Sequence, residues 1–200
     1  EGMTPTAYYA GSLLALYVLL LSMSLGDYPA GSMWRDRIWK SYGLSWGMQT
    51  MGRIWWVACA LTLGCMPFMV FIGFWGARGG VNQHWSIATI LGVAAAFLCT
   101  AALVHLLHLI FDVRRNLLLA LGTGSLALGY FCGCYLPEVL LPESIKRVAV
   151  YLPLTYMRRA WTDVFTNKEG DWKNTGILLM FAIFFYVLCY IRLKSMEDTI

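Results

Sequence analysis

One short pattern in the chain matches the spacing around a catalytic serine. Gly43 to Gly47 read Gly-Leu-Ser-Trp-Gly, which is the Gly-x-Ser-x-Gly pattern of the nucleophile elbow in hydrolases. That elbow needs a strand before the serine, a helix after it, and an acid and a histidine downstream. Here the pattern lies in an aromatic connector beside a hydrophobic segment, so we interpret it as a chance match.

Two histidines, His105 and His108, lie three residues apart in an apolar segment and would share one helix face. They could ligate a metal or relay protons, since ionisable residues inside a membrane segment suggest function. They also lie within two turns of a basic segment end, where they can reach lipid headgroups. We favour a structural role and predict no metal site.

The cysteines show no metal-ligand or redox spacing. None forms a Cys-x-x-Cys pair, and Cys132 and Cys134, two apart, would point to different faces of a helix. We interpret all six as structural thiols: Cys59, Cys65, Cys99, Cys132, Cys134 and Cys189.

The motifs for nucleotide and metal chemistry are missing from the sequence. The glycine-rich stretch Gly122 to Gly129 lacks the Gly-Lys-Ser/Thr ending that binds phosphates, and no His-Glu-x-x-His occurs. We therefore expect no enzyme activity and no cofactor bound by this chain.

Long uncharged segments account for most of the chain, and they must hold any functional residues in position. Hydrophobic residues make up 59% and charged residues 13% of the 200, where a soluble domain has about 25% charged. Apolar segments of this length cross a bilayer as helices. The sequence predicts an all-α integral membrane protein, one transmembrane domain over 1–200, with five spans near residues 8–25, 55–75, 85–111, 117–136 and 176–191.

The net charge of +4 does not indicate a nucleic-acid partner. The 15 basic residues are scattered through short loops and line no single face. The expected surroundings are a lipid bilayer, and the basic residues alone do not decide the orientation.

The first long connector, 29–53, contains an amphipathic pattern. Trp34, Ile38 and Tyr42 recur every four residues, with Arg37 and Lys40 opposite, as in a helix lying on a membrane surface. It is either a solvated connector or a lever that contacts a cytoplasmic partner.

The second long connector, 137–172, is divided by Pro137, Pro142 and Pro153 into pieces too short to span a bilayer. Apolar residues recur with helical spacing in two of these pieces. We predict short re-entrant or interfacial helices here.

Small residues form a stripe on two of the predicted spans. The fourth span carries Gly122, Ser125, Gly129 and Gly133, and the first carries Gly11, Ala15 and Ser22. Such stripes let helix backbones approach closely, either within one subunit or between two subunits.

The order of these parts resembles the membrane subunit of type-2 ABC transporters. Gly129 to Tyr156 is similar to that family's small-residue span, Leu-Pro repeats, amphipathic helix and Leu-Pro-x-Thr-Tyr ending. Ser32 to Arg53 is similar to its charged segment before a span. The family has six spans, so the resemblance implies that the first span and an outer domain are missing here.

The resemblance implies a permease of the cell membrane that exports a substrate by alternating access. It places 29–53 in the cytoplasm and 137–172 outside. Its partners would be ABC ATPase subunits, which carry ATP and Mg, and a second membrane subunit in a homodimer or heterodimer. The residues implied in coupling to the ATPase are Trp34, Arg35, Arg37, Ile38, Lys40 and Tyr42. Those implied at the translocation path and dimer interface are Tyr17, Ser125, Gly129, Tyr130, Phe131 and Gly133.

Two other classes remain open. A polytopic membrane enzyme would need polar groups converging at one depth, and His105, His108 and Tyr130 are the candidates. A scaffold or channel without energy coupling would keep the small-residue stripes and have no use for a basic surface helix. The apolar, aromatic interface is a weak indication of an amphipathic or lipid-like cargo.

Overall fold

The described part of the chain is helical. The computed structural model describes residues 5–26, 46–78, 83–111, 115–166 and 170–197, and these ranges contain no strand. The elements in chain order are α1 (Pro5–Gly26), α3 (Trp46–Arg78), α4 (Ile87–Phe111), α5 (Arg115–Phe131), the 3-10 turn η1 (Glu138–Leu140), α6 (Glu143–Ala149), α7 (Pro153–Phe165) and α8 (Trp172–Glu197). The predicted all-helical class is confirmed for these residues.

Four helices among the described residues are long and apolar enough to cross a membrane. They are α1, α3, α4 and α8, which correspond to the first, second, third and fifth predicted spans. The remaining predicted span, 117–136, is represented by α5, which has 17 residues. At 1.5 Å per residue, a helix of this length covers about 26 Å of a hydrocarbon layer roughly 30 Å thick. The structure therefore suggests a membrane protein with four candidate crossings, and the fifth is not confirmed.

The early end of α5 has a local cause at Gly133. This glycine has φ +75°, in the left-handed region that favours glycine. The Gly133 N–H donates to the Tyr130 carbonyl at 3.2 Å, and the Cys134 N–H donates to the Gly129 carbonyl at 2.8 Å. These two bonds form a Schellman motif, which stops the helix five residues before the predicted end of the span.

The second predicted span is longer in the structure. The helix α3 has 33 residues and begins at Trp46. Residues 46–53, which the sequence suggested were part of the surface segment, form its first two turns. The rest of that segment, 29–45, lies outside the described residues.

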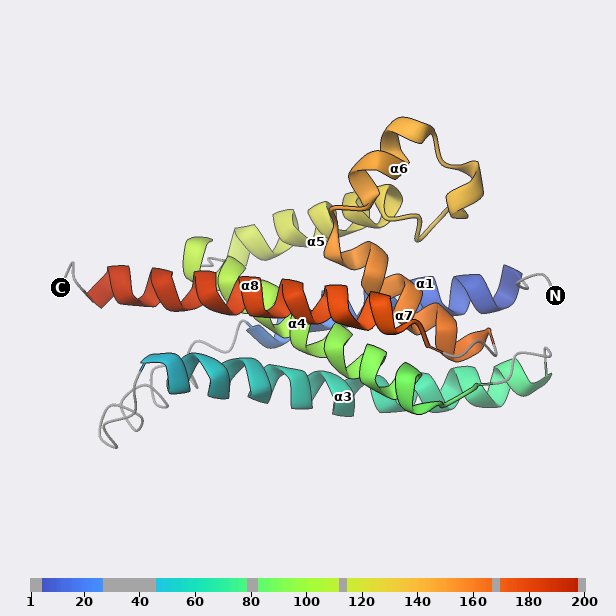
Figure 1. The fold of residues 1–200 in the computed structure, drawn as a ribbon, viewed down its shortest axis with the longest axis horizontal. Coiled ribbons are helices and arrows are strands. Elements are labelled where there is room, and N and C mark those ends of the chain that lie inside the picture. The colour runs from blue at the N-terminus through green and yellow to red at the C-terminus, as the bar shows by residue number, and fades with distance from the viewer. Residues whose placement is uncertain (1–4, 27–45, 79–82, 112–114, 167–169, 198–200) are drawn as a thin grey trace.

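The long helices lie side by side along one axis, as Figure 1 shows. The helices α4 and α8 run in the same direction and make the most extensive helix contact in the described chain. The chain between them must therefore return along the bundle. It returns in two pieces, first α5 and then α7 (Figure 1).

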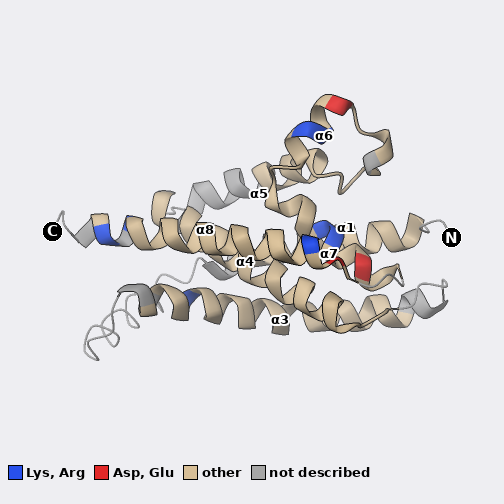
Figure 2. Cartoon of the chain, in the orientation of Figure 1, with Lys and Arg blue, Asp and Glu red and all other residues tan. Residues whose placement is uncertain are grey.

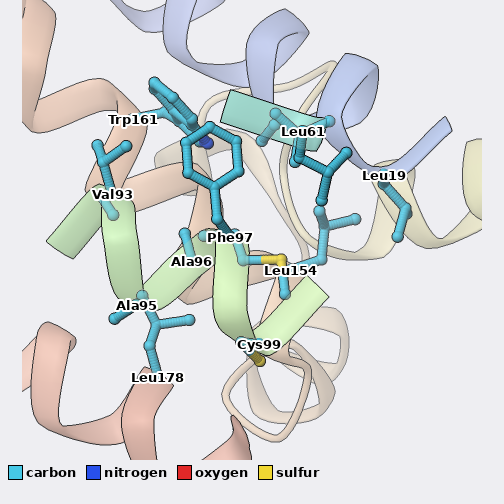
Figure 3. Packing of buried hydrophobic residues seen from close by; sticks show 14 of the residues in the cluster. Leu19, Leu61, Val93, Ala95, Ala96, Phe97, Cys99, Leu154, Trp161 and Leu178 are labelled. Atoms are coloured by element: carbon cyan, nitrogen blue, oxygen red, sulfur yellow. The ribbon is translucent and has the colours of Figure 1, made fainter. Parts of the chain in front are cut away.

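The core centres on α4. Its buried alanines, including Ala95, Ala96 and Ala102, allow α8 to approach closely. On another side of α4, the Phe97 ring meets the Trp161 ring of α7 edge to face, with centroids 5.4 Å apart (Figure 3). The central helix thus touches both a full-length helix and the short α7.

The segment between α5 and α8 contains short helices that begin at prolines. Pro142 precedes α6, and Pro153 is the first residue of α7, where a missing N–H costs nothing. The helix α7 packs against α1, α4 and α8 and is buried over most of its length. Figure 2 shows its basic residues set back from the end of the bundle where α1 begins. That this segment lies on the outer side of the membrane without crossing it stays a prediction.

Candidate functional site

A buried arginine joins the short helix α7 to the end of α5. Arg158 is 3% exposed, and its Nε–H donates to the Cys132 carbonyl at 3.0 Å. Its guanidinium carbon lies 5.0 Å from the centre of the Tyr8 ring on α1. An isolated buried cation would be very costly, and these contacts offset part of that cost. We call Tyr8, Cys132, Gly133, Leu136 and Arg158 the arginine junction.

The end of α5 provides the acceptors of this junction. The last carbonyls of a helix have no partner within the helix and form the negative end of its dipole. The Tyr8 hydroxyl lies within hydrogen-bonding reach of the Gly133 carbonyl and, at 3.0 Å, of the Leu136 carbonyl. Side chains from α1 and α7 therefore satisfy carbonyl groups at and beyond the end of α5.

The arginine junction links three helices through polar contacts. It contains one cation, one hydroxyl and backbone carbonyls, and these groups bind one another across three helices. Across the described ranges, no three His, Cys, Asp or Glu side chains come close enough to hold a metal ion. A shift of α1 or α7 would strain these bonds and pull on the end of α5.

Tyr17 and Gly129, both implied in the translocation path, contact helices of their own chain. The Tyr17 hydroxyl donates to the Gly64 carbonyl of α3 at 3.3 Å, and its ring stacks on Phe68 at 5.0 Å. A Cβ on Gly129 would lie 2.8 Å from Cδ2 of Leu16 on α1. The small residue thus permits a close contact between α1 and α5 within the subunit.

The other residues implied in the path differ in exposure. Ser125 is buried, whereas Tyr130 and Phe131 are 42% and 41% exposed with their rings edge to face at 6.0 Å. Gly133 lies beyond the last residue of α5, so Gly129 is the member of the Gly-x-x-x-Gly pair that lies on the helix. The structure therefore places these residues in different surroundings, some buried and some exposed.

The predicted coupling residues cannot be placed. The described ranges do not include Trp34, Arg35, Arg37, Ile38, Lys40 or Tyr42, and Ser45 of the serine pattern is also outside them. His105 is half-buried on α4, and the side chain of His108 is not described.

Sequence reasoning missed the arginine junction. It treated Arg158 as one charge of a connector, although an arginine flanked by apolar helical spacing and a preceding proline is a recognisable signal. It also placed Tyr8 at the start of a span with no role. The partner carbonyls could not be foreseen, because they depend on where α5 ends.

No family model, curated protein or solved structure matches the chain, so the site is defined by its geometry and the family stays an expectation from the residues.

Proposed function

We propose that this chain is the membrane subunit of an ATP-driven exporter of the cell membrane, similar to type-2 ABC permeases. The observation that carries the proposal is α7, a 13-residue helix that begins at a proline and is buried among α1, α4 and α8. A short buried helix that precedes the last long helix, α8, fits the Pro-interrupted segment of that family. The four apolar helices are consistent with a multi-pass membrane protein.

Transport would proceed by alternating access between two packings of the same helices. ATP binding to partner ATPase subunits favours one packing by its differential affinity. The arginine junction ties α1, α5 and α7 together, so these helices would move as one unit. Leu126, Leu128, Tyr130 and Phe131 are exposed on α5 and provide an apolar surface for a second membrane subunit.

The experiment that tests this proposal uses the chain purified from its native membrane with bound proteins. We expect a P-loop ATPase to co-purify and to hydrolyse ATP. Changing Arg35, Arg37 and Lys40 to glutamate should leave insertion intact and lower that hydrolysis, because the basic surface segment is the proposed contact with the ATPase.

A matched control changes Arg147, Lys168 and Lys173 to glutamate, which alters the net charge equally in the segment proposed to lie outside and at the adjoining start of α8. This variant should keep ATP hydrolysis near the wild-type rate. Absence of an ATPase partner, or equal losses in both variants, would contradict the proposed function.

A further inference from the structure

A partly open cavity of about 310 Å³ lies beside the arginine junction, among the end of α5, η1, α6 and the start of α7. Two basic side chains, Lys146 and Arg159, line it together with Cys132, Thr155 and apolar side chains. The apolar lining is Val139, Leu141, Ala149 and Val150. Val139 and Val150 are themselves exposed, so the cavity is accessible from the surface of the bundle.

The charge around this cavity favours an anion. No acidic side chain is among its described lining residues. Residues 143–159 contain four basic residues and one acidic residue. The buried Arg158 lies nearby, since it donates to the carbonyl of Cys132, and Cys132 also lines the cavity. The acid is Glu143, which is 77% exposed and pairs with Lys146 at 2.7 Å. An exposed pair of this kind contributes little, so Lys146 can turn toward a ligand.

The surface around the cavity is apolar. Val139, Leu140 and Tyr151 are 85%, 67% and 79% exposed, and Val148 and Val150 are about half exposed. Large apolar side chains this exposed suit contact with lipid chains. The cavity is near the lower size limit of small-molecule pockets, so it accommodates a phosphate with a small organic group and excludes long hydrocarbon chains.

We propose that this cavity binds the phosphate-bearing headgroup of an anionic membrane lipid. The phosphate would lie between Lys146 and Arg159, where an ammonium and a guanidinium give charge-assisted hydrogen bonds. The hydrocarbon chains would leave the cavity across the exposed apolar rim. This site goes beyond the proposed transport function and does not depend on it, because binding needs neither ATP nor a partner subunit.

Titration of the full chain in a neutral detergent tests the proposal. The probes are short-chain phosphatidylglycerol, phosphatidylcholine of the same chain length, and inorganic phosphate. We expect phosphatidylglycerol to bind at least about tenfold more tightly than either other probe, because only it combines a net negative headgroup with apolar chains. Equal binding of the two lipids would overturn the proposal. Binding of inorganic phosphate as tight as that of phosphatidylglycerol would also overturn it, since the site would then select a soluble anion.

Variants locate the binding in this cavity. The double variant Lys146→Gln with Arg159→Gln should weaken phosphatidylglycerol binding by about tenfold or more, because both charged contacts are lost. Arg147→Gln is the matched control, since Arg147 is exposed on the same helix and does not line the cavity. Ala149→Phe should block the cavity while keeping both charges. Unchanged affinity in the double variant, or equal losses in the double variant and the control, would place the lipid elsewhere.

Discussion

Arg158 and Tyr8 stabilise the same helix end from two sides. The guanidinium reaches the Cys132 carbonyl from α7, and the phenol reaches the Leu136 carbonyl from α1. Arginine suits this position better than lysine, because its Nε–H can bond one carbonyl while its planar face lies over an aromatic ring. The junction therefore depends on side-chain geometry as much as on charge.

We predict that Tyr8→Phe destabilises the chain by about 1–2 kcal/mol. The change keeps the ring beneath Arg158 and removes the hydroxyl that bonds the carbonyls beyond the end of α5. The measurement is the thermal unfolding of the purified chain in detergent.

The control for this prediction is Tyr9→Phe. Tyr9 is 41% exposed, and its hydroxyl makes no hydrogen bond to the described residues. Its ring contact with Tyr8 would be kept, so stability should not change. Equal unfolding temperatures for the two variants would mean that the Tyr8 hydroxyl contributes nothing.

Among the elements, α7 is held in place by backbone proximity as well as by side chains. A Cβ on Gly11 of α1 would lie 2.7 Å from the N and Cα atoms of Thr162 on α7. Real Cβ atoms do not approach backbone this closely, so the two helices can meet here only because residue 11 is glycine. This contact fixes how deeply α7 sits against α1.

We predict that Gly11→Ala destabilises the bundle by about 1–3 kcal/mol, because α1 and α7 must move apart to accommodate a methyl group. Gly176→Ala on α8 is the matched control, since a Cβ there would meet nothing within 4 Å. It should be neutral or slightly stabilising. Unfolding of both variants in detergent measures the difference, and a neutral Gly11→Ala would contradict the close packing of α1 and α7.

The elements differ in how far their sequences predict them. Hydrophobic length was sufficient for α1, α3, α4 and α8, because a spanning helix needs little more than apolar residues. It was insufficient for the end of α5, which depends on one left-handed glycine, Gly133. It was also insufficient for the burial of α7, where Thr155, Arg158 and Thr162 are polar yet buried by contacts distant in sequence. The helix α3 begins at Trp46, nine residues before the predicted span, in a stretch whose charged and aromatic residues resemble a surface segment.

At the scale of the whole molecule, the direction of α8 sets the topology. The helix α8 runs the length of the bundle in the same direction as α4, so it begins at the end where α4 begins and ends at the opposite end (Figure 1). The start of α8 then shares an end with the start of α4 and with the end of α7. If 137–172 lies outside, the start of α8 must also lie outside and its end inside.

We predict that cysteines at the two ends of α8 react from opposite sides of the membrane. In a background without the native cysteines, Lys173→Cys should react with an impermeant thiol reagent applied from outside, and Lys194→Cys should react only after the membrane is opened. Both positions are exposed. Reaction of both cysteines from the same side would contradict a membrane-spanning α8, and reversed sides would contradict the proposed orientation.

The short α5 also makes the two sides of the bundle unequal in height. The apolar window of α3 has 25 residues and α5 has 17, which correspond to about 37 Å and 26 Å. If α3 and α5 both cross a bilayer, that bilayer would meet hydrophobic mismatch and thin beside α5. The thinned zone would then adjoin Arg158, which bonds the Cys132 carbonyl just beyond α5, and thinning would lower the cost of a buried charge there. A polar group crossing along α5 would therefore traverse the narrowest hydrocarbon barrier that this subunit creates.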